Sequence, residues 1–178
     1  MVSFETARLR CRSLSLDEYL SFDNGVEPRW DSFSNPYRHL VEGPSPLVHR
    51  IPRVKNNPEF ADIGLVLAIE KSTEVIIGSA GFHDFPNNEG MIEVGFGIVP
   101  EKQNLGFGTE LLHGMWGIAC QRFELKTLRY TVSPENAPSL HLISKLGFKL
   151  VGEQIDEEDG RELIYESSVR DYLAKIRP

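Results

Sequence analysis

Hydrophobic and polar residues alternate from Arg8 to Leu14 in the segment RLRCRSL, and this period of two predicts a β-strand with one solvent-facing side. The following segment, SLDEYLSF, changes to helical spacing. Ser15 with Glu18 three residues later is a capping-box pattern, so we expect a helix to begin at Ser15. From Asn24 to Pro58 repeated prolines interrupt the pattern, and we predict that this stretch is irregular, with at most short helical pieces.

Three β-rich runs follow, at residues 63–71, 74–85 and 90–99, and the short turns STE and PNNEG join them as an antiparallel meander. Helical spacing then runs from Phe107 to about Arg122. After it we expect a strand in LKTLRYTV, a loop and helix in residues 133–148, and a hairpin of residues 149–156 and 161–169 closed by EEDG. This order predicts an α+β fold with a mixed, mostly antiparallel central sheet flanked by helices.

Length and composition narrow the class of protein. A chain of 178 residues fits one domain, 1–178, that buries roughly 70% of its unfolded surface. The net charge of −7 and the lack of a long basic run argue against a nucleic-acid partner. Cys11 and Cys120 match neither a disulfide framework nor a metal spacing, so we predict no metal and a cytoplasmic location. We also expect no signal peptide and no membrane span.

The segment QNLGFG places Gly106 and Gly108 between a predicted strand and a predicted helix. Backbone N–H groups at a helix N-terminus bind anions, and glycines leave room for a phosphate there. The alternative is that Gly106 only permits a tight turn. A P-loop would need Gly-Lys-Ser/Thr, and a dinucleotide fingerprint would need a third glycine where this chain has Leu111, so neither motif fits.

The pattern Gln/Arg-x-x-Gly-x-Gly/Ala, here 103–108, resembles the coenzyme A pyrophosphate loop of the GNAT N-acyltransferases. NAPSLHLISKLGF resembles a second GNAT signature, and it begins at Asn136, 28 residues after Gly108. The segments ETARLRCRSLSLDEY and IEVGFGIVPEKQNLGFGTELL further resemble the RimJ/RimL-type branch. The resemblance spans residues 3 to about 170 and is weakest between Asn24 and Pro58.

The resemblance implies an α+β GNAT fold, acetyl-CoA as co-substrate and direct acetyl transfer to an amine. It also implies which residues hold the donor. Backbone groups would hold the pantetheine arm and thioester at Phe96, Gly97, Ile98 and Val99. The pyrophosphate would lie against Gln103, Asn104, Leu105, Gly106, Phe107, Gly108 and Thr109, and further coenzyme A contacts would come from Asn136 and Ser139.

Glu93 is a lone acid in the apolar run MIEVGFGIV, and a charge in such a run needs a reason. It matches the position at which many GNAT members carry a general base. Alternatively, Glu93 lies on the solvent-facing side of its strand or pairs with an arginine. If the PNNEG turn centres on Asn88, antiparallel pairing places His83 opposite Glu93, and the two could share the deprotonation of an amine.

Ser139 is a candidate acid for the leaving thiolate, with a hydrogen bond at the helix start as the alternative role. Many GNAT enzymes instead use a tyrosine four residues further along, where this chain has Ile143. Asn136 is expected to fix the loop and contact coenzyme A. Trp116 is expected in the core, whereas Trp30 and the other aromatic residues of the irregular segment are candidates for lining an acceptor groove.

The acceptor is limited by the free energy needed to deprotonate it. At pH 7 an α-amino group costs about 1.4 kcal/mol and a lysine side chain about 4.6 kcal/mol, so one weak base favours an N-terminal amine. The RimJ/RimL resemblance also points to protein N-termini, such as those of ribosomal proteins. Two alternatives stay open: a small-molecule amine such as an antibiotic, polyamine or amino acid, and a non-catalytic acyl-CoA-binding module. The sequence leaves monomer and homodimer equally open.

Overall fold

The computed structural model describes residues 1–43, 45–156 and 160–176. The chain divides into two compact units, residues 1–82 with 96–115 and residues 83–95 with 116–178. Strand β5 (Met91–Ile98) and helix α4 (Phe107–Arg122) contribute to both units. The prediction of a single domain over 1–178 stays a prediction. Among the described residues, no helix has the length and apolar character that a membrane span requires.

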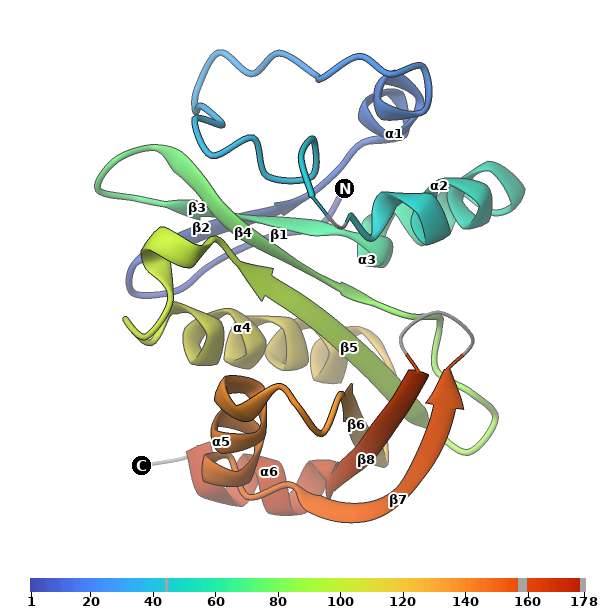
Figure 1. Ribbon diagram of the computed structural model, residues 1–178. Coiled ribbons are helices and arrows are strands. Elements are labelled where there is room, and N and C mark those ends of the chain that lie inside the picture. The colour runs from blue at the N-terminus through green and yellow to red at the C-terminus, as the bar shows by residue number, and fades with distance from the viewer. Residues whose placement is uncertain (44, 157–159, 177–178) are drawn as a thin grey trace. The chain divides into compact units, whose positions relative to one another are not determined.

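The first unit is an antiparallel sheet with helices on both faces. Its strands are β1 (Ser3–Glu5), β2 (Leu9–Ser13), β3 (Val66–Glu70) and β4 (Val75–Phe82), each paired with the next. Helices α1 (Leu16–Asp23), α2 (Leu47–Asn56) and α3 (Ala61–Gly64) lie along one face, and the first part of α4 lies along the other (Figure 1). All five residues of β3 are buried, as expected for a strand covered on both faces.

Helix α1 confirms the predicted capping box. The Ser15 hydroxyl accepts from the Glu18 N–H at 3.2 Å, and the Glu18 carboxylate accepts from the Ser15 N–H at 2.7 Å. The two reciprocal bonds satisfy backbone donors that the helix itself leaves unpaired.

The prediction of an irregular stretch from Asn24 to Pro58 is wrong for α2, which contains Pro52 in its interior. A proline inside a helix costs about 3 kcal/mol. Leu47 and Val54 are almost fully buried on one face of α2, and this burial offsets the cost. Three short elements were not predicted from the sequence: β1, α3 and the C-terminal helix α6 (Val169–Ile176).

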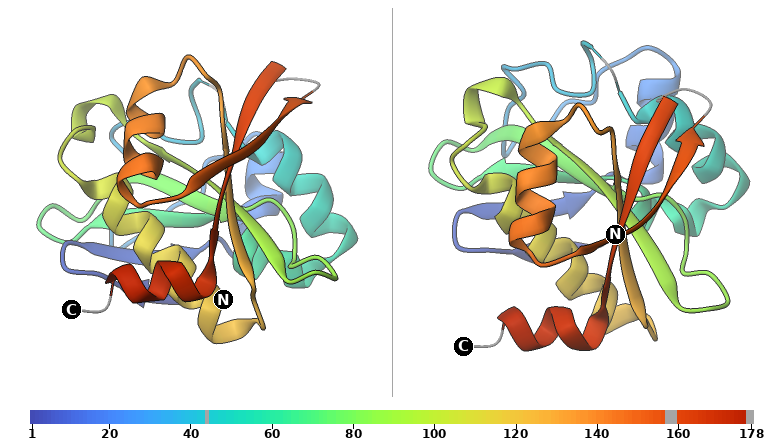
Figure 2. Two further views of the ribbon diagram at one scale, coloured as in Figure 1. Left: turned by 90° about the horizontal axis from the view of Figure 1, so that it is seen from below. Right: turned by 60° about the horizontal axis from the view of Figure 1, so that its bottom comes forward.

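The second unit is built on a mixed sheet. β5 pairs in parallel with β6 (Thr127–Val132), which pairs antiparallel with β8 (Gly160–Ser168), and β8 pairs with β7 (Lys149–Asp156). Helix α5 (Ala137–Lys145) follows β6, and α6 follows β8 (Figure 2). The eight strands run in the order β1-β2-β3-β4-β5-β6-β8-β7, mostly antiparallel as predicted. Most of the EEDG turn, residues 157–159, lies outside the described residues.

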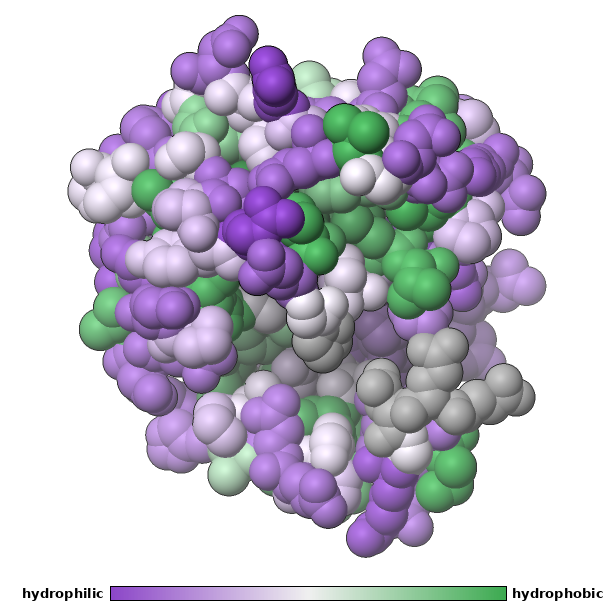
Figure 3. All heavy atoms as spheres, turned by 45° about the horizontal axis from the view of Figure 1, so that its top comes forward, coloured by the Kyte–Doolittle hydropathy of each residue, from purple (hydrophilic) through white to green (hydrophobic). Residues whose placement is uncertain are grey.

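Trp116 lies in the core of the second unit, as predicted. Its ring stacks on Phe148 at a centroid distance of 4.7 Å and meets Tyr172 edge-on at 5.2 Å. Trp116 is fully buried, so this aromatic cluster joins α4 to α6 and to the start of β7. On the face that Figure 3 presents, hydrophilic side chains predominate and hydrophobic ones show in patches between them, which is ordinary for a folded protein.

Candidate active site

The predicted pyrophosphate loop lies in the first unit and has the backbone that anion binding requires. Residues 103–106 are exposed, and α4 begins at Phe107. Asn104 (φ 60°) and Gly106 (φ 83°) both adopt left-handed conformations, which asparagine and glycine tolerate best. Because α4 begins here, the N–H groups of Phe107, Gly108 and Thr109 have no acceptor within the helix. The loop therefore presents backbone donors at the positive end of a 16-residue helix.

Two contacts anchor the start of this loop. The Gln103 side-chain amide donates to the Ile98 carbonyl at 2.9 Å, so this predicted ligand residue also ties the loop to the end of β5. Lys102 Nζ lies 2.7 Å from Glu70 Oε2. The hydrogen bond from Lys102 lowers the pKa of the Glu70 carboxyl below its usual value, against the effect of burial, so both groups are charged at neutral pH.

The end of β5 carries the residues predicted to hold the pantetheine arm. Gly97 is exposed, and a Cβ added there would meet no atom within 4 Å, so the backbone at Gly97 is open to a ligand. The Val99 N–H, in contrast, donates to the Ile77 carbonyl at 2.9 Å. This amide is engaged in the sheet. Phe96 and Ile98 are half-buried on either side of Gly97.

Glu93 lies in the second unit and is held by two side chains. The Thr131 hydroxyl donates to Glu93 Oε1 at 2.6 Å, and His83 Nδ1 lies 3.3 Å from the same oxygen. In the backbone, the His83 N–H donates to the Glu93 carbonyl oxygen at 2.9 Å, which confirms the predicted pairing of these two residues. The Glu93 side chain is only 16% exposed, so it does not simply point into solvent.

Two features of the surroundings favour the contact between Glu93 and His83. A Cβ on Gly95 would lie 2.9 Å from His83 Nε2, so the absence of a side chain at Gly95 leaves room for the imidazole. Arg129, the register partner of Glu93 on β6, binds Glu166 at 2.6 Å. The alternative that Glu93 pairs with an arginine therefore finds no support at Arg129.

Ser139 and Asn136 lie at the start of α5. The Asn136 side chain accepts from the Ser139 N–H at 3.2 Å and caps the helix, as expected of a residue that fixes the loop. Burial raises the pKa of the Tyr130 hydroxyl, and the side chain of Ser139 opposes this shift. Ile143, where many GNAT enzymes have tyrosine, is fully buried.

Successive side chains of a strand point to opposite faces, so Thr131 and Tyr130 mark the two faces of β6. Glu93 is bonded to Thr131 and therefore lies on the Thr131 face. The parallel ladder between β5 and β6 runs from Met91 to Glu93 on the β5 side.

The roles of Thr131, Gly95 and Tyr130 were not predicted from the sequence. The alternation in LRYTV identifies Tyr130 and Thr131 as facing opposite ways, but the partner of each depends on the parallel register between β5 and β6, which the sequence does not contain. Of the aromatic residues proposed for an acceptor groove, Trp30 donates its indole N–H to Glu18 Oε1 at 2.5 Å and stacks on Phe33 at 5.2 Å. Both rings are half-buried.

Comparison with known proteins identifies the family. The family model described as "Acetyltransferase (GNAT) domain" matches residues 33–149, well over half of the chain. The protein belongs to the GNAT acetyltransferase family. GNAT domains use acetyl-CoA as co-substrate.

Individual relatives agree with this assignment. Uncharacterized N-acetyltransferase p20 of Bacillus licheniformis is 28% identical over 93 residues, a match that covers 52% of each chain. The chain thus spans about half the length of this curated relative. Among solved structures, the ribosomal-protein-S5-alanine acetyltransferase of Vibrio fischeri superimposes with a TM-score of 0.68 at 15% identity, covering 100% of both chains. The spermidine/spermine N-acetyltransferase SpeG of Vibrio cholerae gives 0.66 at 16% identity, covering 96% of this chain and 98% of that one. These two similarities concern the fold alone.

Proposed function

We propose that this protein transfers an acetyl group from acetyl-CoA to the α-amine of a protein N-terminus, with Glu93 as the general base. The observation that carries the proposal is the setting of Glu93. A carboxylate that is 16% exposed and held by the Thr131 hydroxyl and the His83 ring has a fixed orientation, and its second oxygen stays available to accept a proton.

The loop residues fit the diphosphate of coenzyme A. Acetyl-CoA supplies an activated acetyl thioester when it is bound. The N–H groups at the start of α4 offer donors to a phosphate, and Gly106 and Gly108 leave space for its approach. The open backbone at Gly97 suits an extended arm lying along β5. We also propose that Asn136 and Ser139 contact coenzyme A.

Amide formation needs a proton acceptor at the amine and a proton donor at the departing sulfur. In the tetrahedral intermediate both atoms are bonded to the same carbon, so the base and the acid must both reach that carbon's substituents. Glu93, held by Thr131 and His83, is assigned to the amine. We assign Ser139, near the start of α5, to the sulfur.

The acceptor follows from the free energy needed to deprotonate its amine. One carboxylate base handles an α-amine more easily than a lysine side chain because deprotonation of the α-amine costs about 3 kcal/mol less at pH 7. The ribosomal-protein acetyltransferase among the structural neighbours and the RimJ/RimL resemblance support a protein N-terminus. We therefore rank a ribosomal-protein-like N-terminus first.

A small amine is the second candidate because a spermidine/spermine acetyltransferase has the same fold. The net charge of −7 suits a cationic acceptor of either kind. The third candidate, a non-catalytic acyl-CoA-binding module, does not explain why Glu93 is held in a fixed geometry. A cytoplasmic location and a choice between monomer and homodimer stay predictions.

Release of the coenzyme A thiol distinguishes the candidates. The purified chain is incubated with acetyl-CoA and a panel of N-terminal peptides, spermidine, free amino acids and an aminoglycoside. We expect the highest kcat/KM for a peptide, and mass spectrometry should place the acetyl group on its α-amine. Preference for a small amine favours the second candidate. Tight acetyl-CoA binding without turnover on any acceptor, together with no change on Glu93→Gln, favours the third.

A further inference from the structure

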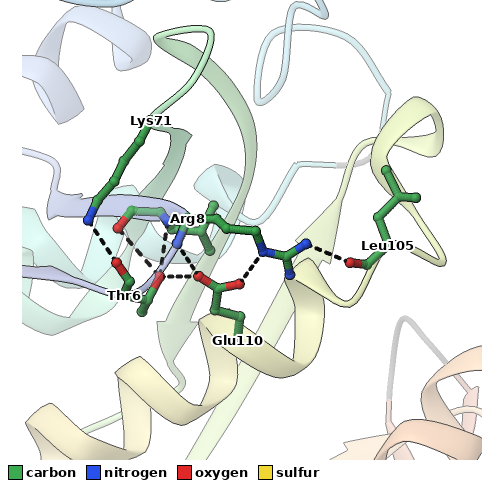
Figure 4. A network of polar contacts seen from close by, with 6 residues as sticks. Thr6, Arg8, Lys71, Leu105 and Glu110 are labelled. Carbon is green, nitrogen blue, oxygen red and sulfur yellow. Dashed lines mark hydrogen bonds and ion pairs between the residues drawn. The ribbon is translucent and has the colours of Figure 1, made fainter.

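A cluster of polar contacts connects the turn between β1 and β2 to the loop that precedes α4, and all of it lies within the first unit (Figure 4). The turn contains Thr6 and Arg8, and Glu110 lies in the first turn of α4. Arg8 and Glu110 are 102 positions apart in the sequence, so the fold alone brings them together.

Glu110 is the centre of this cluster. Its Oε1 accepts from the Thr6 hydroxyl at 2.5 Å and from the Arg8 N–H at 2.6 Å, and its Oε2 accepts from Arg8 Nε at 2.7 Å. Burial opposes the charge on Glu110, but these hydrogen bonds outweigh burial and lower its pKa below the usual value. Glu110 is therefore ionised at neutral pH and fixes the Arg8 side chain in one orientation.

The fixed guanidinium contacts three consecutive loop residues. Arg8 Nη1 donates to the Leu105 carbonyl at 2.9 Å. The Arg8 guanidinium carbon lies 4.1 Å from the centre of the Phe107 ring. Arg8 Nη2 would lie 3.4 Å from a Cβ on Gly106, which places it directly beside that glycine.

The contacts of Arg8 hold a part of the loop that lies outside regular secondary structure. Leu105 and Gly106 are exposed, and Gly106 needs a left-handed conformation to turn its backbone toward a ligand. A loop held in its binding conformation before the ligand arrives loses less entropy on binding. Glu110 offsets most of the charge of Arg8, so orientation of the loop, rather than added positive charge, is the larger effect of this side chain.

We infer that Arg8, oriented by Glu110 and Thr6, is a positioning residue that holds Leu105–Phe107 in the conformation that binds the diphosphate of coenzyme A. This inference rests on the proposed function, in which that loop binds coenzyme A. It adds a residue that lies about 95 positions before the loop in the sequence.

Binding of coenzyme A to the full chain, measured by calorimetry, tests the inference. We expect Arg8→Ala to raise the Kd about tenfold or more, as for the loss of hydrogen bonds to charged groups. We expect Arg8→Lys to recover little of the affinity, because an ammonium cannot bond Glu110 and Leu105 in the planar arrangement of a guanidinium. With the best acceptor from the panel, Arg8→Ala should raise the KM for acetyl-CoA and leave kcat within about twofold.

Arg10→Ala is the matched control. Arg10 lies on β2 with a similar exposure and pairs with Glu74 instead of Glu110, so its removal should leave the Kd unchanged. Glu110→Gln, which keeps the side-chain volume, should weaken binding in the same direction as Arg8→Ala. Circular dichroism and the Tm of each variant show whether it folds.

Each outcome decides between named alternatives. A Kd for Arg8→Ala within twofold of the wild type, or an equal loss in Arg10→Ala, overturns the inference. Full affinity in Arg8→Lys also overturns it, because charge alone would then suffice. If the wild-type chain does not bind coenzyme A at all, the proposed function itself fails. That result is distinct from wild-type binding that Arg8→Ala leaves unaffected.

Discussion

Gly95→Ala offers a direct test of whether the contact between His83 and Glu93 matters for the reaction. An alanine Cβ would lie 2.9 Å from His83 Nε2, whereas ordinary contact distances begin at 3.4 Å. The ring must therefore move by at least about 0.5 Å, the difference between these two distances. His83 is 44% exposed, so it can swing toward solvent and leave the Glu93 carboxylate.

The substitution should hardly change the stability of the fold. Replacing a strand glycine with alanine stabilises by roughly 0.5–1 kcal/mol, because Gly95 does not need a left-handed conformation. Loss of the partly exposed contact between His83 and Glu93 costs at most about 1 kcal/mol, even if the two groups are charged. These effects oppose each other, so the Tm should shift by no more than roughly 2–4 °C for a chain of this size.

Turnover, in contrast, should fall. If the contact stabilises the working arrangement by up to about 1 kcal/mol, its loss lowers kcat by up to about fivefold. His83→Ala should lower kcat by the same factor. The double variant should lose no more than either single one, because both changes remove one interaction. Steady-state kinetics with the best acceptor, measured across pH 6–9, provides the comparison.

Gly117→Ala is the control for this experiment. It makes the same chemical change inside α4, where an added Cβ meets no atom within 4 Å, and it should leave kcat unchanged. The reasoning is refuted if Gly95→Ala keeps the wild-type kcat while His83→Ala loses activity, or if the two losses multiply in the double variant.

Two further predictions follow from hydrogen bonds to carboxylates. Thr131→Val keeps the side-chain shape but removes the 2.6 Å bond to Glu93, so kcat should fall roughly tenfold while the Kd of acetyl-CoA, measured by calorimetry, stays unchanged; an unaltered kcat would contradict this role. Burial opposes the charge on Glu18, but bonds from Arg12, Ser15 and Trp30 outweigh it and hold the pKa below the usual 4.5. As the pH falls, Glu18 is therefore protonated in the unfolded chain before it is protonated in the folded protein. Ionised Glu18 thus increases the free energy of unfolding above pH 4.5, and this contribution is lost as the pH falls through the folded-state pKa. Urea unfolding at a series of pH values should therefore show a shallower acid dependence for Glu18→Gln than for the wild type, and equal slopes would count against the assignment.

Much of this fold could be predicted because strands, helix caps and tight turns are determined by residues that lie close together in the sequence. The alternation in RLRCRSL and the pairing of Ser15 with Glu18 led directly to β2 and the start of α1. The symmetry of the PNNEG turn likewise placed His83 opposite Glu93. Helix α2 was missed because Pro52 reads as a helix breaker, and only burial of its apolar face against the rest of the first unit offsets that effect.

The supporting residues of the site could not be predicted in the same way. The contact between Thr131 and Glu93 requires the parallel register of two strands separated by α4. The contact between Arg8 and Leu105 requires the β1–β2 turn to pack beside α4. Both contacts join residues that are far apart in the sequence, and no local pattern of residues indicates which distant segments pack together.

We propose Glu93 as the general base of an acetyl-CoA-dependent N-acetyl transfer. The most direct test of this proposal is the kcat of Glu93→Gln at saturating acetyl-CoA and acceptor, measured beside the Kd of acetyl-CoA for the same variant. We expect kcat to fall at least about 100-fold, as for removal of a general base, while the Kd stays within about twofold. A variant that keeps the wild-type kcat across the pH range would contradict the assignment of Glu93.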